Sequence, residues 1–525
     1  MPDPTPPRAP APEPGFEAPR PAGGAGPIAI AFALIALALA IGWQNLPEDT
    51  QRRALGLGPI PASEPLPFDF ADASAIQAKV HIQAAAELDA LSPGSGAQFR
   101  QQAQTATDAA AIDLGDKMAG MIVAGEVTGP DAALERLEQI QTELELAAMD
   151  EQLAEHSGPL PNAFDPFGIA SGRAADFADY NERFHDALRQ DIPLFETLYS
   201  LGPEALDDDE RERIETRYRY LGRLALTWDM EDSAPARAEL LHGGTLWRLA
   251  GLGVFFLVAI FAFFAGFVTL VFAAIWLGSG KLKPRAAKPA VHGGALLEAV
   301  GIFALLFFVM SAGTTWIAEN NPALGILQLP LQWSLILVPL WPLVRGWRAS
   351  EWRAAMGISR GRGVVREIAA GFVGYLAAIP LFVAGVLLSF IAMYLDVSLF
   401  GEHPVPPSNP VLDVLMDADW LVLLLVASLA CVWAPLCEEL IFRGALFSQV
   451  RRRFGWVLAA IASTLAFAFM HSYGPLILWP IMALGLSFAV MRWWRGSLIA
   501  CITAHAIHNT TLTIMMVALS GLFPA

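Results

Sequence analysis

The chain has 525 residues, of which 54% are hydrophobic and 16% are charged, and its formal net charge is −17. A soluble domain typically has about 45–50% apolar and about 25% charged residues, so the composition argues against a soluble globular protein. The three cysteines, Cys431, Cys437 and Cys501, all lie in apolar segments. They provide neither a disulfide framework nor a spaced zinc motif, and we expect them to pack as small apolar side chains.

Several segments are apolar and long enough to cross roughly 30 Å of hydrocarbon, which takes roughly 20 residues of helix. The candidates are residues 27–43, 249–278, 293–316, 324–344, 367–394, 419–440, 455–471, 475–491 and 497–519. We therefore predict an all-α fold, a polytopic transmembrane helical bundle of about nine spans with an inserted extracytoplasmic helical domain.

The chain begins with residues 1–26, a Pro-rich stretch that cannot bury a core and is predicted to be a disordered tail. The apolar run at 27–43 could be the hydrophobic part of a signal peptide. However, its acidic, Pro-rich lead is a poor signal-peptide start, and no small-residue cleavage site stands out. We interpret residues 27–43 as an uncleaved transmembrane anchor.

Residues 46–247 are acidic, with 37 Asp and Glu against 15 Lys and Arg. Apolar residues at helical spacing predict helices near 74–91, 97–125, 130–156, 172–191 and 207–228. We expect a solvated helical domain without chemistry of its own. Its acidity could recruit a protein partner of basic character or repel anionic surfaces, and the sequence does not distinguish these alternatives.

The charges of the short loops alternate along the rest of the chain. Segments rich in Lys and Arg occur at 280–288, 345–367, 451–453 and 492–495, and acidic or neutral segments at 318–321, 394–419 and 471–475. Because basic short loops mark the cytoplasmic side, the N-terminus is predicted to be cytoplasmic and residues 46–247 extracytoplasmic. We expect a multi-pass protein of the cell membrane, in a bacterium the inner membrane.

Two adjacent carboxylates, Glu438 and Glu439, interrupt an apolar segment. A charged side chain at bilayer depth costs roughly 2.5–3.5 kcal/mol, so such residues usually line a protein interior and serve a function. Glu439 and Arg443 are four residues apart, which places a carboxylate and a guanidinium on one helix face. We predict that Arg443 holds Glu439 as structural support and leaves Glu438 as a candidate general base.

Histidines and an asparagine follow in the next apolar segments. His505 and Asn509 are also four residues apart, so their side chains should project together and could stabilise an oxyanion. At 1.5 Å per residue from the cytoplasmic boundary, Glu438 and Asn509 lie about 20 Å deep and His505 about 13 Å deep. His471 lies at about 28 Å by the same reckoning, deeper than the other three.

These residues resemble a known family. The segments "EELIFR", "FAFMH" and "HAIHN" match its EExxxR, FxxxH and HxxxN motifs in order on consecutive spans. The chain resembles the CAAX-protease and bacteriocin-processing family of intramembrane proteases over roughly residues 340–519, and "RASEWRAAMGI" is similar to the family's cytoplasmic lead-in. The resemblance implies that Glu438 and His471 activate water and that His505 and Asn509 stabilise the oxyanion.

The predicted organisation is then an accessory set of transmembrane helices at 249–344 and a catalytic intramembrane domain at 345–519. Its expected activity is hydrolysis of a peptide bond in a membrane-associated protein or peptide by activated water. The partners expected are the lipid bilayer and that substrate, and no nucleic acid. We do not expect the substrate to be prenylated, because the architecture looks bacterial.

Cofactor use and two other functions remain open at this stage. Glu438, His471 and His505 could bind a divalent metal such as zinc, or the same groups could activate water without one. The alternatives to a protease are a catalytically inactive membrane scaffold or immunity-type protein, and a proton-coupled transporter. The sequence contains no HExxH motif, which argues against a zincin-like site.

Overall fold

The computed structural model describes all residues except 1–25, 58–64, 67–72, 158–168, 285–292, 322–323, 325–326, 401–419, 472–473 and 521–525. Every regular element in the described part is a helix, which confirms the all-α class there. The predicted disordered tail lies almost wholly outside the described residues. The same holds for most of the predicted acidic loop at 394–419 and for part of the basic loop at 280–288.

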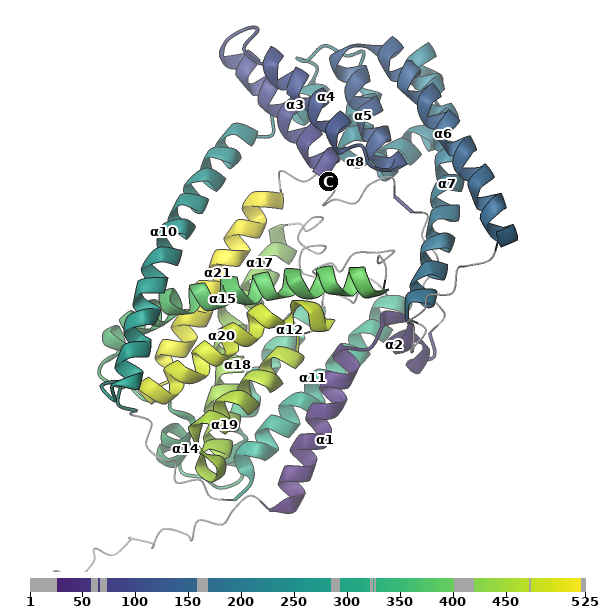
Figure 1. Ribbon diagram of the computed structural model, residues 1–525. Helices are drawn as coiled ribbons and strands as arrows, with labels where there is room; N and C mark the ends of the chain where they lie inside the picture. The colour runs from purple at the N-terminus through teal and green to yellow at the C-terminus, as the bar shows by residue number, and fades with distance from the viewer. Residues whose placement is uncertain are drawn as a thin grey trace, which may run out of the picture.

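The N-terminal half contains α1 (Pro27–Gln44), α2 (Glu48–Ala54), α3 (Ala73–Leu91), α4 (Ala97–Ala110), α5 (Leu114–Val127), α6 (Pro130–Ser157), α7 (Ile169–Leu201), η1 (Pro203–Ala205), α8 (Asp208–Leu226) and α9 (Pro235–Leu241). The C-terminal half contains α10 (Thr245–Gly278), α11 (Ala295–Asn320), α12 (Gln328–Trp333), η3 (Ser334–Leu340), α13 (Trp341–Val344), α14 (Ala349–Met356), α15 (Val364–Phe400), α17 (Trp420–Ser428), η4 (Leu429–Trp433), α18 (Ala434–Glu438), η5 (Glu439–Leu446), α19 (Phe447–Phe469), α20 (Gly474–Arg495) and α21 (Ile499–Ser520). The helices α3 to α9 gather at one end of the molecule and α14 lies toward the other (Figure 1).

Helices α3 to α9, which we call the helical unit, pack around a core of their own that includes Met118, Phe195 and Tyr218. The single helix predicted at 97–125 is wrong, because two helices, α4 and α5, occupy this stretch. Asp113 starts the second helix by accepting a hydrogen bond from the backbone of Asp116, whose own side chain reaches back to complete a capping box.

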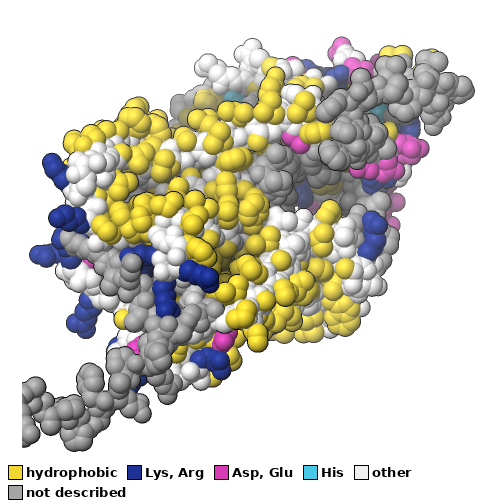
Figure 2. Space-filling model, turned by 60° about the horizontal axis from the view of Figure 1, so that its bottom comes forward, with side chains coloured by type: hydrophobic (Ala, Val, Ile, Leu, Met, Phe, Trp, Pro, Cys, Tyr) yellow, Lys and Arg dark blue, Asp and Glu magenta, His cyan; other side chains and the backbone are white. Residues whose placement is uncertain are grey.

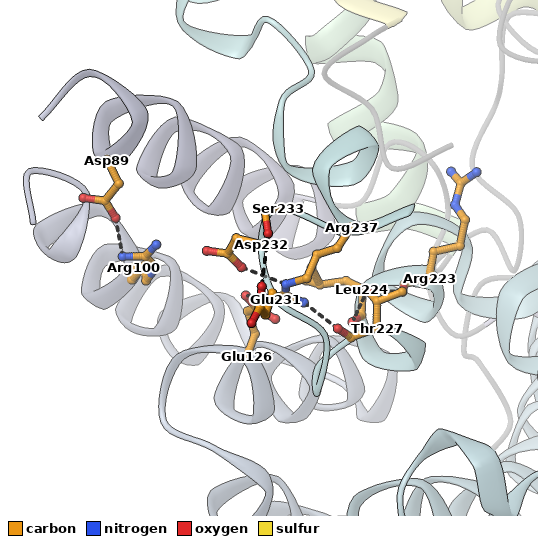
Figure 3. A network of polar contacts seen from close by, with 10 residues as sticks. All are labelled: Asp89, Arg100, Glu126, Arg223, Leu224, Thr227, Glu231, Asp232, Ser233 and Arg237. Carbon is orange, nitrogen blue, oxygen red and sulfur yellow. Dashed lines mark hydrogen bonds and ion pairs between the residues drawn. The ribbon is translucent and has the colours of Figure 1, made fainter. Parts of the chain in front are cut away.

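An ion-pair network joins the helices of this unit. Arg237 of α9 contacts Glu126 of α5 at 2.5 Å and Asp232 at 2.8 Å, and it donates a hydrogen bond to the carbonyl oxygen of Thr227 (Figure 3). Burial raises the pKa of the Glu126 carboxyl, although Arg237 acts in the opposite direction. Because both Glu126 and Arg237 are nearly inaccessible to solvent, the pair fixes α9 against α5.

Small residues set the packing of α1 in the other half of the molecule. Ala33, Ala36 and Ala40 are buried on one face of α1, and a Cβ at Gly301 of α11 would lie 2.6 Å from the ring of Phe32. The two backbones can approach closely because no large side chain separates them, as is usual between membrane helices. Helix α1 is therefore an integral part of the bundle.

Among the described residues, six helical stretches are long and apolar enough to cross a membrane: Pro27–Gln44, Pro235–Gly278, Ala295–Ile317, Val364–Phe400, Trp420–Phe469 and Ile499–Leu519. They support a multi-pass membrane protein. The predicted number of about nine is not confirmed. The predicted spans at 419–440 and 455–471 fall in one continuous stretch that kinks at Gly455, and the predicted span at 324–344 contains shorter apolar helices. The segment predicted at 475–491 is α20.

The surface of the bundle is broadly apolar in the face shown in Figure 2, and Lys and Arg side chains gather along one end of it. Helix α10 is the clearest case, since Phe256, Phe261 and Phe264 are all more than half exposed. An apolar surface of this extent is expected where lipid, not water, surrounds the protein.

Candidate active site

The helix that carries the two glutamates is not a regular α-helix. Two π-helical segments, η4 and η5, flank the short α18, so that Glu438 ends α18 and Glu439 begins η5. Pro435 within this region has no backbone N–H to donate, which breaks the α-helical hydrogen-bond pattern. Such π-helical insertions occur frequently at functional sites, because they re-aim a few side chains without ending the helix.

Glu439 lies at the centre of a buried polar cluster. Its Oε1 accepts a hydrogen bond from Arg443 Nη1 at 2.9 Å, as the spacing of four residues predicts, and lies 3.1 Å from His505 Nδ1. Arg443 Nη2 donates to the carbonyl oxygen of Gly485, and its guanidinium lies 4.2 Å from the ring centre of Phe467. Glu439 and Arg443 have no solvent-exposed surface, so each depends on the other for compensation of its charge.

Glu438 is partly exposed, unlike Glu439, and it lacks the contacts with Arg443 and His505 that hold Glu439 Oε1, although the Oε2 atoms of both glutamates accept no hydrogen bond from the described residues. Its side chain is 14% exposed, and its Oε2 lies 3.9 Å from His505 Nε2, too far for a hydrogen bond. The same oxygen is buried and accepts no hydrogen bond from the described residues. A carboxylate oxygen in this state is available to accept a proton or a hydrogen bond from a bound molecule.

His505 connects the two glutamates through opposite nitrogens of one ring. An ionised Glu439 can only accept hydrogen bonds, so it places the proton on Nδ1 and leaves Nε2 directed toward Glu438. The ring of Phe488 stacks on the imidazole with centres 5.1 Å apart, and the edge of Phe467 approaches it at 5.8 Å. The imidazole is therefore fixed in both orientation and tautomer.

Asn509 lies one helical turn beyond His505 on α21, as the sequence predicts. Its Nδ2 donates a hydrogen bond of 2.7 Å to the carbonyl oxygen of Ala430 in η4. One turn further, the hydroxyl of Thr513 lies 3.6 Å from Cys431 Sγ. These two contacts join α21 to η4 along a line that we call the seam. The bond to Ala430 uses one of the two amide hydrogens of Asn509 and leaves the other for the predicted oxyanion role.

His471 lies just beyond the C-terminal end of α19 and is half-buried. Its Nδ1 is 2.8 Å from the carbonyl oxygen of Phe467, and its ring centre is 4.9 Å from that of Phe467. Phe467 thus touches both His471 and His505 and joins the fourth predicted residue to the cluster. Membership of His471 in a reacting site stays a prediction.

The described side chains of the site do not form a metal centre. Among the described residues, no group of three or more His, Cys, Asp or Glu side chains is arranged to hold one. Glu438, His471 and His505 do not form such a group. The residues present do not fit a resident metal, so the reaction below contains no step through one.

Charged residues that the sequence placed in cytoplasmic loops are buried near this cluster. Arg495 of α20 contacts both carboxylate oxygens of Glu367 on α15 at 2.6 and 2.8 Å. Arg492 donates to the carbonyl oxygens of Arg443 and Gly496. Their burial could have been predicted from the sequence, because both arginines directly follow an apolar segment, and charged residues beside such segments often face the protein interior.

His508, which the resemblance does not include, lies on the side of α21 that faces α15. Its Nδ1 is 3.3 Å from the hydroxyl oxygen of Tyr375, and its ring packs edge-on against Phe382 at 5.0 Å. The packing role expected for the cysteines agrees with the full burial of Cys437 and Cys501.

The comparison with protein families adds an independent observation. A family model described as type II CAAX prenyl endopeptidase Rce1-like matches residues 419–511. We call the matched residues 419–511 the Rce1-like segment. The resemblance read from the three motifs is thereby confirmed over this part of the chain, which contains Glu438, His471, His505 and Asn509. No curated protein and no solved structure matches the chain.

The Rce1-like segment suggests a protease of the CAAX endopeptidase type, embedded in the bilayer and acting on a peptide substrate. It includes η4, η5, α19 and α20 and most of α21. The helical unit, α10, α11 and α15 lie outside it, so their contribution must be argued from this chain alone.

Proposed function

We propose that this protein is an intramembrane endopeptidase in which Glu438 activates a water molecule for direct attack on a peptide carbonyl. The observation that carries the proposal is the contrast between the two adjacent glutamates within the Rce1-like segment. The Oε1 of Glu439 is held by Arg443 and His505 and its side chain has no exposed surface, whereas Glu438 is 14% exposed and its buried Oε2 accepts no hydrogen bond from the described residues. Only Glu438 has the freedom that a general base needs.

The reaction begins when Glu438 takes a proton from water as the oxygen attacks the carbonyl carbon. His505 Nε2, directed toward Glu438 by the Glu439 contact, helps to orient the water together with His471. The electron pair of the carbonyl bond moves to oxygen, and the resulting oxyanion receives a hydrogen bond from the amide hydrogen of Asn509 that Ala430 does not engage. Glu438 then returns the proton to the leaving amine as the C–N bond breaks.

No acyl-enzyme is part of this mechanism. Cys437 directly precedes Glu438 but is completely buried, so its thiol cannot reach a substrate. Direct attack by water requires one carboxylate that can alternate between base and acid, and Glu438 supplies it.

We also propose about nine membrane spans, a cytoplasmic N-terminus and an extracytoplasmic helical unit. The gathering of Lys and Arg at one end of the apolar surface in Figure 2 supports this orientation. An impermeant maleimide should label a cysteine placed at the exposed Gln101 in intact cells, but should label one placed at Arg453 only after lysis. The reverse pattern would overturn the orientation.

The activity can be tested with purified protein in lipid vesicles and a panel of quenched fluorescent peptides, with and without a lipid anchor. We expect wild-type protein to cleave members of the panel and Glu438→Gln to be inactive on all of them. A parallel series with a chelator should leave the rate unchanged, since the residues do not fit a resident metal. Equal cleavage by wild type and Glu438→Gln would eliminate the proposed mechanism, whereas absence of cleavage by both proteins would favour the scaffold alternative.

A further inference from the structure

The start of α10 is capped by a residue from another helix. Gly244 precedes α10 in the left-handed conformation with φ 70°, and no side chain of its own segment caps the first turn. Instead, Glu87 of α3 accepts hydrogen bonds from the backbone N–H groups of Thr245 at 2.7 Å and Leu246 at 3.0 Å. An anionic side chain satisfies the exposed N–H groups and also interacts favourably with the positive end of the helix dipole.

Gln83, one turn earlier on α3, holds the same turn from a second side. Its Nε2 donates to the carbonyl oxygen of Leu240 at 2.7 Å, and its Oε1 accepts from the hydroxyl of Thr245, which is fully buried. A Cβ at Gly243 would lie 2.7 Å from Gln83 Nε2, so the turn fits closely against α3. The helical unit and α10 are therefore joined by a packed, hydrogen-bonded junction.

The first turn of α10 also reaches the helix that carries His505 and Asn509. Arg248 Nη1 donates a hydrogen bond of 3.3 Å to the carbonyl oxygen of Ala518, near the C-terminal end of α21. Arg248 Nε contacts the carbonyl oxygen of Gly243, which ties the guanidinium back to the capped turn. A cation at a helix C-terminus is stabilising because the last carbonyl groups lack partners within the helix.

A second line of contacts runs deeper in the bundle. Gly266 of α10 packs so closely on α15 that a Cβ there would lie 2.1 Å from the carbonyl oxygen of Leu376. On α15, a Cβ at Gly371 would lie 2.7 Å from both the carbonyl oxygen of Ala500 and the side chain of Thr503 on α21. Helix α10 thus contacts the C-terminal end of α21 directly, and it contacts the N-terminal part of α21 indirectly, through α15.

We propose that Glu87 and Arg248 are positioning residues that set α21 against η4, so that the helical unit controls the placement of His505 and Asn509. The consequence for catalysis rests on the proposed function. The positioning of α21 against η4 does not depend on the proposed function, because it concerns only the contact between two helices. Whatever binds the helical unit and moves α3 would change the alignment of the site.

Cys431 provides a native reporter of this alignment. Its sulfur faces Thr513 across the seam between η4 and α21, and it is partly accessible, whereas Cys437 and Cys501 are fully buried. The rate at which N-ethylmaleimide modifies Cys431 in the full chain in lipid nanodiscs therefore reports opening of the seam, and mass spectrometry identifies the modified residue. This measurement needs no substrate.

Arg248→Ala and Glu87→Ala should each increase the modification rate of Cys431 about two- to fivefold, the change expected from loss of a helix-terminus contact. Arg248→Lys should keep the wild-type rate because it retains a cation there. Arg189→Ala is the matched control, since Arg189 forms an ion pair with Asp186 on its own helix, α7, which is far in sequence from the junction. Elution of each variant as a single species in gel filtration shows that it is folded.

A wild-type rate in both alanine variants would overturn the proposal, and so would an equal increase in Arg189→Ala. Failure of the proposed function gives a different result: Glu438→Gln would cleave like the wild type while the Cys431 rates still followed Arg248 and Glu87. If Arg248→Ala opens the seam but cleaves peptides at the wild-type rate while Glu438→Gln is inactive, the positioning role is wrong and the proposed function stands.

Discussion

At the scale of single residues, the two adjacent glutamates have separate environments. The spacing of four residues correctly places Arg443 on Glu439, because that contact lies within one helix. The contact of His505 with the same carboxylate joins residues 66 positions apart. Counting residues from the membrane boundary gives a depth for each side chain but not the direction it faces, so this contact could not be predicted.

Removal of one partner from the buried pair should be costly. Arg443→Met leaves Glu439 as a buried charge with His505 as its remaining contact, and we expect a loss of about 3–5 kcal/mol in stability. Thermal unfolding of the purified protein, followed by intrinsic fluorescence, measures the effect.

The matched control is the double variant Glu439→Gln/Arg443→Met, which removes both charges and should unfold at a higher temperature than Arg443→Met alone. An Arg443→Met protein that melts with the wild type would contradict the assignment of this pair as structural support.

At the scale of elements, periodicity located most helices but not their internal irregularities. Of the five helices predicted between 74 and 228, three correspond to single helices, the one at 207–228 is α8 with a kink at Arg219, and the one at 97–125 is divided at the Asp113 capping box. Pro435 is a local signal that the α-helical pattern is broken near Glu438, but it does not predict π-helical turns, because the choice between α- and π-helical turns also depends on the helices that pack beside them.

The junction between α14 and α20 depends on the absence of a side chain at Gly357. This residue has φ 79°, and a Cβ would lie 2.5 Å from Cζ of Arg492, which donates to the carbonyl oxygen of Arg443. Gly357→Ala should cost about 1–2 kcal/mol from backbone strain and about 1–3 kcal/mol more from the steric clash.

Gly346→Ala separates the two effects, because Gly346 also has a positive φ, of 85°, but has open space where the Cβ would stand. The difference between the two melting temperatures isolates the clash with Arg492. Equal losses in both variants would mean that Arg492 moves aside freely.

The stability of the hairpin formed by α3 and α4 should decrease at acidic pH. The backbone N–H of Gly96 and, to a smaller extent, Arg100 lower the pKa of the Asp89 carboxyl below its usual 3.8 (Figure 3). A lowered folded-state pKa means that the stabilisation is complete above the ordinary pKa and is lost as the pH falls through the lowered one.

Hydrogen exchange of the full chain between pH 6 and pH 3 gives the free energy of opening of the helical unit. This free energy should therefore fall less steeply with decreasing pH in Asp89→Asn than in the wild type. Because this ion pair is partly exposed, we expect a difference of roughly 0.5–1 kcal/mol. Parallel curves would show that Asp89 is not the titrating group.

At the scale of the whole molecule, the composition alone predicted a multi-pass helical membrane protein, and the six candidate spans agree with it. The division into spans was predicted less well. Apolar length does not reveal how the helices within Trp420–Phe469 meet, because the non-helical backbone at Gly455 is a conformational property of a single residue. The junction of α3, α10 and α21 was equally inaccessible, since it is built from contacts between residues far apart in sequence.

The central claim is that Glu438 is the base of an intramembrane endopeptidase. The most direct measurement compares membranes from cells producing wild-type, Glu438→Gln or Cys437→Ala protein at equal levels, with new peptide ends quantified by mass spectrometry. We predict peptide ends in membrane proteins that accumulate with wild type and with Cys437→Ala, and that fall at least about 100-fold with Glu438→Gln, the minimum expected for loss of a general base. The same peptide ends at the same level with Glu438→Gln would contradict the account.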